Sequence, residues 1–352
     1  MASILTSNAV ASKKSQWPLR LRQGASLLLI LALVALVLWL GGKKHFGPQQ
    51  YGQLILDGLR GGAIYALIAL GLVTIYNVTN VINFAQGAFV MLGAMVTADL
   101  FARELLPFSP ALNLVAAAVL AILFATLVGV LMERTIIYPV RDASPLTLII
   151  ITVGAYIVIQ GLALVYWGSG GLKLPAFSTF FTDATRDTVY RPFGIIIKGQ
   201  SLWIWATTAA VLVLLYWFFN FTIYGKAFQA SAINRTAARL MGISPSKMSL
   251  MAFAVAAAVG AVAGIVLAPV TAPTYDMGLK LGLKGFVAAI VGGLVSAPAA
   301  VIGGLLLGVV ENVAAGVTKS GLKDIFAFII LILVLLYRPQ GILSKGKETE
   351  KV

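Results

Sequence analysis

Cysteine is absent from this chain of 352 residues, and histidine occurs once, as His45. The absence of cysteine excludes disulfide bonds and thiolate metal sites. The single histidine argues against a histidine-based catalytic or metal site, because such sites combine several ligands or a paired base and nucleophile. We therefore expect neither a metal site nor a histidine-assisted nucleophile in this chain.

Motifs for nucleotide binding and hydrolysis are missing as well. The phosphate-binding pattern G-x-x-x-x-G-K-S/T does not occur, and neither do G-x-S-x-G and H-E-x-x-H. No catalytic residue, metal or cofactor is therefore assigned to the chain, which is not expected to be an enzyme. Energy for any active process must then come from another protein.

Acidic residues are scarce, with 12 Asp and Glu against 26 Lys and Arg, for a net charge of +14. In a soluble protein such an excess suggests a nucleic-acid partner. Here many basic residues flank apolar segments, and no aromatic-and-basic motif of an RNA or DNA module is present. We interpret them as orientation signals and lipid headgroup contacts, and we expect no nucleic-acid partner.

Apolar sequence dominates what remains, since 60% of residues are hydrophobic and 11% are charged. Continuous apolar windows of about 20 residues predict an all-α polytopic membrane protein and disfavour a β-barrel. Eight to ten transmembrane or re-entrant helices are expected. The range allows for two of the ten candidates, because 80–99 begins with polar residues and 283–297 is short and rich in glycine. The candidate spans are 25–41, 54–76, 80–99, 111–132, 146–168, 201–221, 248–270, 283–297, 299–317 and 321–337.

The first span raises a choice between a signal peptide and an anchor. Basic residues precede the apolar run 25–40, as in a signal peptide, but no convincing small-x-small cleavage site follows it. We therefore expect residues 1–50 to be an extension that contains an uncleaved anchor helix. Both termini would then be cytoplasmic, together with segment 222–247, whereas loop 169–200 would be extracytoplasmic. Five spans precede this loop and five follow it, as in transporters built from two inverted halves.

Amides cluster at the edge of the span 80–99. Asn77, Asn80, Asn83 and Gln86 lie within ten residues, and unpaired amides in hydrocarbon cost free energy. On a continuous helix Asn80, Asn83 and Gly87 would share one side. Two roles remain open for these amides: they line a path for a polar solute, or they hydrogen-bond neighbouring helices.

A second glycine-rich segment, 282–308, includes Gly292 and Gly293. These glycines permit close helix packing, or a hinge that opens a passage, and the two roles are compatible. Glu311 follows in an apolar run and is expected either to be functional or to pair with a neighbouring helix. The candidate pathway residues are Asn80, Asn83, Gln86, Gly87, Gly292 and Gly293.

One hydrophilic island interrupts the second half of the chain. The sequence TIYGKAFQASAINRTAARLMGISPS, residues 222–246, lies between two long apolar runs. Its pattern predicts two short helices joined by a turn and closed by Gly242 and Pro245. Such a segment must be held in water, and its small, apolar and basic side chains suggest that it contacts a partner.

Five motifs in one order resemble the permeases of branched-chain amino acid ATP-binding-cassette (ABC) transporters. The resemblance covers residues 50–345 and includes the run Asn83-Phe84-Ala85-Gln86-Gly87. The other motifs are YPVRDASPLTLIIITVGAYIVIQ (138–160), GKAFQASAINRTAARLMGI (225–243), KGFVAAIVGGLVSAPAAVIGGLLLGVVEN (284–312) and YRPQGIL (337–343). The first fifty residues do not fit this pattern.

The resemblance implies an importer permease domain at 51–345, followed by a cytoplasmic tail at 346–352. Segment 222–247 would be the coupling loop that docks onto an ATPase, through Ala230, Asn234, Arg235, Arg239 and Gly242. The implied partners are a second, homologous permease, two ATPases that bind ATP and magnesium, and a periplasmic solute-binding protein. The implied location is the bacterial cytoplasmic (inner) membrane, and the implied solute is a branched-chain or other neutral amino acid.

Two alternatives stay open at this point. The first is a different solute, because permeases of urea or short-amide importers share the same signature. The second is a stand-alone secondary transporter or channel, which would need titratable or ion-binding residues at mid-membrane. Acidic residues are scarce there, which favours the importer.

Overall fold

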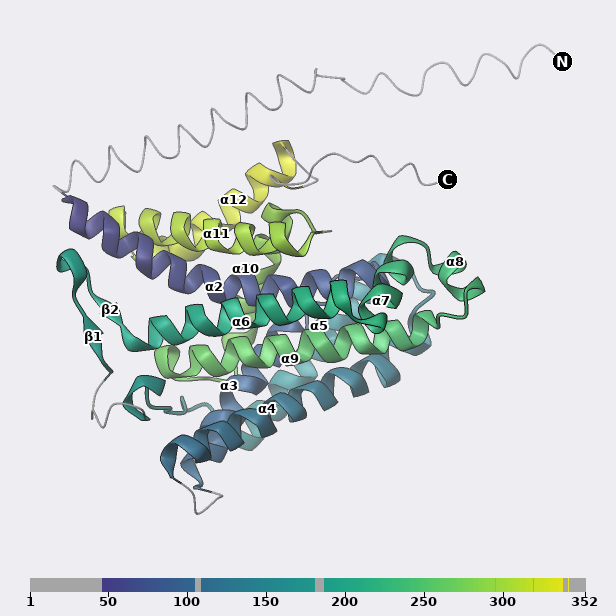
Figure 1. The fold of residues 1–352 in the computed structure, drawn as a ribbon, viewed down its shortest axis with the longest axis horizontal. Helices are drawn as coiled ribbons and strands as arrows, with labels where there is room; N and C mark the ends of the chain where they lie inside the picture. Colours follow the sequence, from purple (N-terminus) through teal and green to yellow (C-terminus); the bar gives the residue numbers. More distant parts are fainter. Residues whose placement is uncertain are drawn as a thin grey trace, which may run out of the picture.

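The computed structural model describes residues 46–104, 109–180, 187–294, 296–318, 320–337 and 341. These residues form a bundle of long helices that run broadly along one direction (Figure 1). The expected anchor helix at 25–41, His45 and the tail at 346–352 lie outside the described residues.

Nine long helices make up the bundle among the described residues. They are α2 (Pro48–Thr79), α3 (Gln86–Ala102), α4 (Pro110–Met132), α5 (Pro145–Trp167), α6 (Gly199–Phe221), α9 (Pro245–Thr271), α10 (Met277–Gly292), α11 (Ala297–Val317) and α12 (Lys323–Tyr337). Two short helices, α7 (Ile223–Ile233) and α8 (Arg235–Leu240), and a two-stranded hairpin, β1 (Val189–Tyr190) and β2 (Ile197–Lys198), complete the main elements. Each of the nine expected spans from 54 onward corresponds to one long helix.

Three of those spans begin about six residues from the predicted position, and α2 is the first of them, since it starts at Pro48 rather than at residue 54. Helix α3 begins at Gln86 rather than at residue 80, and α10 covers Met277–Gly292 rather than 283–297. The shift of α3 arises because α2 ends at Asn80, whose φ of 54° is left-handed. The shift of α10 arises because Lys284, expected near the edge of the span, is buried inside the helix.

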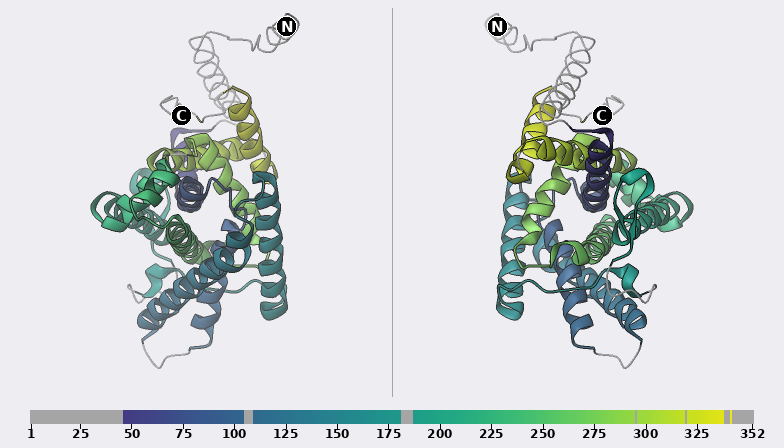
Figure 2. Two further views of the ribbon diagram at one scale, coloured as in Figure 1. Left: turned by 90° about the vertical axis from the view of Figure 1, so that its right-hand side faces the viewer. Right: turned by 90° about the vertical axis from the view of Figure 1, so that its left-hand side faces the viewer.

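Six of these helices are long and apolar enough to cross a membrane, and α3 is a shorter apolar helix. In α2 the most apolar window is 83% buried, whereas in α4, α5 and α6 it is 28%, 28% and 17% buried. Viewed along the bundle, α2 and α9 lie inside while α4, α5 and α6 lie at the margin (Figure 2). Exposed apolar side chains on the marginal helices suit contact with lipid, as expected for a multi-pass membrane protein.

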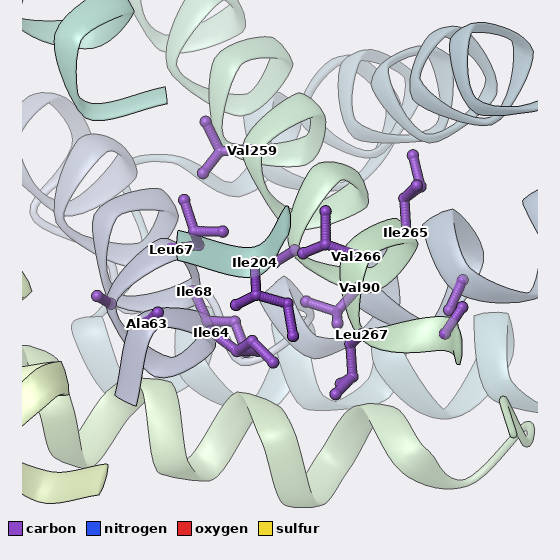
Figure 3. Close-up of a cluster of buried hydrophobic side chains, with 14 of the residues drawn as sticks. Ala63, Ile64, Leu67, Ile68, Val90, Ile204, Val259, Ile265, Val266 and Leu267 are labelled. Carbon is purple, nitrogen blue, oxygen red and sulfur yellow. The ribbon is translucent and has the colours of Figure 1, made fainter. Parts of the chain in front are cut away.

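The core lies where α2 meets α3, α6 and α9. Figure 3 shows Leu67 and Ile68 of α2 close to Ile204 of α6 and Val266 of α9. These four side chains are at most 3% exposed. The packing fixes the two central helices, whose ends carry the polar features described below.

The two ends of the bundle differ. At one end α7 packs against the long helices and α8 projects beyond them, and at the other end lies the β1–β2 hairpin (Figure 1). Among the described residues, the segment that contains the hairpin is tied to the helices by hydrogen bonds. The Leu172 amide donates to Pro273 (2.9 Å), and the Ile196 amide donates to Gln53 (2.8 Å). The described parts of this segment are therefore folded onto the bundle.

Candidate functional site

The break between α2 and α3 carries the amides that the sequence singled out. Asn80 ends α2 with a left-handed φ of 54° and is exposed. Residues 81–85 are not α-helical, so Asn80, Asn83 and Gly87 do not share one face of a continuous helix. That expectation was wrong because a left-handed residue turns the chain out of the helix.

Asn83 is fully buried at the start of α3. Its Oδ1 accepts a hydrogen bond from the Ala85 amide (3.0 Å), and its backbone carbonyl accepts one from the Gln86 amide (3.2 Å). Among the described residues its Nδ2 has no hydrogen-bond partner. The side chain thus caps the break with its oxygen and leaves a donor free.

Gln86 lies between three helices and is also fully buried. Its Nε2 donates to the Ala256 carbonyl of α9 (2.9 Å). A Cβ on Gly71 of α2 would fall 2.1 Å from the same nitrogen. This is the interhelical role that the sequence left open. A further role in a solute path stays a prediction.

Gly87 lies where α3 approaches α10 closely. A Cβ added there would lie 2.0 Å from the carbonyl oxygen of Gly278 and 3.2 Å from Cα of Gly282. The other two candidate glycines lie elsewhere, at the α10–α11 turn, where Gly292 packs on Ala299 and Gly293 has a φ of 94°. The structure therefore gives these glycines close packing, but against two different neighbours.

The hydrophilic island folds as predicted into two short helices, α7 and α8. The Thr222 hydroxyl accepts from the Gly225 amide (2.9 Å) to cap α7, and Asn234 Oδ1 accepts from the Ala237 amide (3.0 Å) to cap α8. Ala230 is half-buried, and its carbonyl accepts from the Asn234 amide. Gly242 follows α8 with a φ of 82°, which favours glycine.

Arg235 joins this island to the break between α2 and α3. Its guanidinium donates through Nε (2.9 Å) and Nη2 to the carbonyl oxygen of Val78, in the last turn of α2. Partial burial, together with the nearby Arg141 cation, lowers the pKa of Arg235 from its usual value. The contact places a cation on the carbonyl end of a helix, where the helix dipole favours it.

The exposed surface of the island carries large apolar side chains next to basic ones, in line with the apolar and basic surface that the sequence indicates. Ile233 is 87% exposed, Leu240 84% and Met241 82%. All three lie on α7, on α8 or just after it, at the projecting end seen in Figure 1. In the sequence, these large apolar residues lie close to Arg239, and this mixture is the signal that points to an exposed contact surface.

A cavity of about 660 Å³ lies beside the island. Its lining includes Arg235, Arg239 and Gly242 from the island, Arg141 and Asp142 from the α4–α5 connection, and Thr79 from α2. Three of the five predicted coupling residues therefore share one cavity with the end of α2. Ala230 and Asn234 do not line it.

A buried ion cluster connects four helices nearer the hairpin end. Lys284 Nζ of α10 lies 2.5 Å from Glu311 Oε1 of α11 and 2.6 Å from Asp324 Oδ1 of α12. The Lys284 ammonium also donates to the Tyr65 hydroxyl of α2 (3.3 Å). Glu311 is therefore paired with a neighbouring helix, one of its two expected roles. Lys284 was missed because a lysine near a span edge ordinarily reaches water.

Comparisons with known proteins agree with this architecture. The family described as "Branched-chain amino acid transport system / permease component" matches residues 54–335. The high-affinity branched-chain amino acid transport system permease protein LivH of Salmonella typhimurium is 34% identical over 304 residues, which cover 85% of this chain and 97% of LivH. BraD of Pseudomonas aeruginosa is 33% identical over 86% of this chain and 98% of BraD.

Two weaker similarities complete the picture. The permease protein LivM of Salmonella typhimurium is 24% identical over 82% of this chain and 70% of LivM. PsaBC from Streptococcus pneumoniae, solved in complex with a Fab, shares 12% identity with a TM-score of 0.41 and covers 86% of this chain and 95% of its own, a likeness too weak to carry an argument. With a family match across most of its length and relatives above 30% identity, this chain belongs to the branched-chain amino acid transport permeases.

Proposed function

We propose that this chain is the membrane-spanning permease of a binding-protein-dependent ABC importer for branched-chain or other neutral amino acids. It works with a second, homologous permease, two ATPases and a solute-binding protein outside the membrane. ATP and magnesium are bound by the ATPases, and the chain itself takes no cofactor. The complex lies in the bacterial cytoplasmic membrane, with the α7–α8 end and both termini on the cytoplasmic side.

The observation that carries this proposal is the α7–α8 island. It projects beyond the bundle with three large apolar side chains more than 80% exposed, Ile233, Leu240 and Met241. Large exposed apolar side chains grouped on a soluble projection favour a protein partner. The chain has no nucleotide-binding motif of its own, so a partner ATPase accounts both for this surface and for the energy source.

The contact between Arg235 and Val78 supports coupling as well as docking. It links the island directly to the end of α2, next to the break that holds Asn83 and Gln86. A movement imposed on the island would therefore reach the polar break without passing through a flexible linker. Packed and hydrogen-bonded elements of this kind can carry energetic coupling between two sites.

The solute class follows from the relatives, whose names specify branched-chain amino acids. The LivM similarity supports a second permease of related sequence. Urea and short amides are the alternative solutes, since permeases for them share the sequence signature. A stand-alone transporter is disfavoured because it leaves the exposed island without a role.

The test is reconstitution of the permease pair with its ATPases in proteoliposomes. ATP inside the vesicles and loaded binding protein outside should drive accumulation of labelled L-leucine, and unlabelled urea should not compete. Accumulation without ATP or without binding protein would support a stand-alone transporter instead. Competition by urea, with no competition by isoleucine, would support the urea alternative.

A further inference from the structure

A cavity of about 340 Å³ opens near the hairpin end, between the first half of α2, the end of α9 and the start of α10. It is separate from the cavity beside the island, which has a different set of lining residues. Asn312 of α11 and Lys323 of α12 close its remaining side. Pockets that hold small molecules begin at about this size, roughly 300 Å³.

Charges of both signs line this cavity, and most of them are already neutralised. Asp57 pairs with Arg60 (3.4 Å), and Lys284 pairs with Asp324 (2.6 Å) and Glu311 (2.5 Å). These pairs form fixed walls, because separating them would leave a buried or half-buried charge uncompensated.

Three further charges in the lining have no ionic partner among the described residues. Within the part of the chain that the structure describes, Lys280 and Lys323 form no ion pair, and Asp276 accepts a hydrogen bond only from the Thr274 hydroxyl (2.7 Å). Lys323 is partly buried, so its ammonium is less well hydrated than that of a surface lysine. The cavity therefore offers two ammonium groups and one carboxylate whose charges a ligand could match.

An apolar wall faces these charges. Ile64 and Leu267, both labelled in Figure 3, belong to the buried core and also line the cavity. Leu281 and Met277 of α10 extend the same wall. A ligand that fits this lining carries a carboxylate, an ammonium group and an aliphatic side chain.

We propose that this cavity is a binding subsite for a zwitterionic α-amino acid with an aliphatic side chain, on the side of the membrane where the solute arrives. The α-carboxylate would pair with Lys280 and Lys323, the α-ammonium with Asp276, and the side chain would lie against Ile64 and Leu267. This inference rests on the proposed importer function and adds to it a place where the permease itself holds the solute.

Binding can be measured separately from transport by the protection of an introduced cysteine. The chain has no natural cysteine, so an introduced one is its single thiol. Thr271 lines the cavity and is exposed, so a Thr271→Cys variant offers one thiol there to a water-soluble maleimide. In the complete importer in nanodiscs, labelling of this chain would be followed by mass spectrometry with L-leucine as the probe. Leucinamide, which lacks the carboxylate, and 4-methylpentanoate, which lacks the ammonium group, are the matched comparison ligands.

L-Leucine should slow the labelling of Thr271→Cys, and the two comparison ligands should do so at least several-fold less well. Adding Lys280→Gln and Lys323→Gln together should weaken the protection by L-leucine about tenfold, because charge-assisted hydrogen bonds are lost. Lys198→Gln, an exposed lysine on β2 outside the lining, is the matched control and should leave protection unchanged.

A second pair of variants tests the cavity by filling it. A Cβ on Gly61, which lines the cavity, or on Gly154 of α5 would meet no heavy atom within 4 Å. Gly61→Met should therefore occupy the cavity without disturbing the fold and abolish protection by L-leucine. Gly154→Met, the same change on an exposed helix face, should leave it intact.

Equal protection by all three ligands, or none by any of them, would overturn the subsite. So would unchanged protection in Gly61→Met. A failure of the proposed importer function would be recognised by a different result: the unsubstituted complex would show no ATP-driven uptake of L-leucine. Normal uptake with no protection at Thr271→Cys would thus reject the subsite and leave the importer function standing.

Discussion

Arg235, at the start of α8, donates two hydrogen bonds to the carbonyl oxygen of Val78, in the last turn of α2. The last carbonyls of a helix have no partner within it, so a cation that binds one both satisfies the oxygen and interacts favourably with the helix dipole. Two residues separated by 157 positions are joined in this way. The contact ties the island directly to the central helix α2.

Replacement of Arg235 by alanine should uncouple the island from α2. We expect the stimulation of ATPase activity by loaded binding protein to fall several-fold, because docking would no longer move the end of α2. The unfolding free energy should fall by about 1.5–3 kcal/mol, the contribution of hydrogen bonds to a charged group. Lys247→Ala, an exposed lysine at the same end, is the control. Full stimulation in Arg235→Ala would show that the contact plays no part in coupling.

Gly242 provides a purely conformational test of the same element. Its φ is 82°, but a Cβ there would meet no heavy atom within 4 Å. Gly242→Val should therefore cost about 1–2 kcal/mol through the left-handed backbone alone, and displace α8 in a protein that still inserts. Gly242→Asn should be milder, because asparagine tolerates this conformation better. ATPase stimulation, compared at equal amounts of assembled complex, would be the measurement, and equal values for both variants would contradict the argument.

The helical bundle could be predicted from the sequence because each span is an apolar run of membrane length. Nine of the predicted spans became long helices, and the caps Thr222, Asn234 and Gly242 delimit the island where the pattern placed it. These features depend on residues close together in the chain, so periodicity and turn chemistry are sufficient.

Features that depend on distant residues were not accessible in this way. Lys284 could not be placed inside α10 without knowing that Glu311, Asp324 and Tyr65 converge on it from three other helices. The contact between Arg235 and Val78 could not be predicted either, since the sequence around each residue gives no indication of its partner. The cavity that contains Lys280 exists only once five helices are assembled.

Gly87 should be intolerant of any side chain. A Cβ at this position would lie 2.0 Å from the Gly278 carbonyl oxygen, so α3 and α10 would have to separate. Gly87→Ala should destabilise the protein by about 1–3 kcal/mol, the usual cost of overpacking. Gly161→Ala on α5 is the matched control, since no heavy atom lies within 4 Å of its Cβ position. Thermal unfolding of the purified complex in detergent would compare them, and equal midpoints would argue against a tight contact.

The buried pair of Lys284 and Glu311 should be far more sensitive to single than to double replacement. Glu311 is fully buried and Lys284 largely so, with 2.5 Å between their charged atoms. Glu311→Leu alone should cost about 1–3 kcal/mol, because the ammonium of Lys284 loses its buried partner and keeps the ion pair with Asp324 at 2.6 Å. Lys284→Met combined with Glu311→Leu should recover part of that loss. Asp142→Asn, which alters a carboxylate that is 94% exposed, should be nearly neutral. A double variant no more stable than Glu311→Leu would contradict the pairing argument.

Asn83 distinguishes a solute path from helix packing. Its Oδ1 caps the Ala85 amide, whereas its Nδ2 is buried without a partner among the described residues. Asn83→Leu removes the hydrogen bond that Asn83 Oδ1 accepts from the Ala85 amide, which costs about 1 kcal/mol, but it also removes an unpaired buried donor, so the net change in stability should be small. Uptake of L-leucine should nevertheless fall several-fold if the free donor serves the solute. Gln86→Leu is the comparison, because it deletes the hydrogen bond to the Ala256 carbonyl and should lower thermal stability first. Normal uptake in a stable Asn83→Leu complex would remove Asn83 from the pathway.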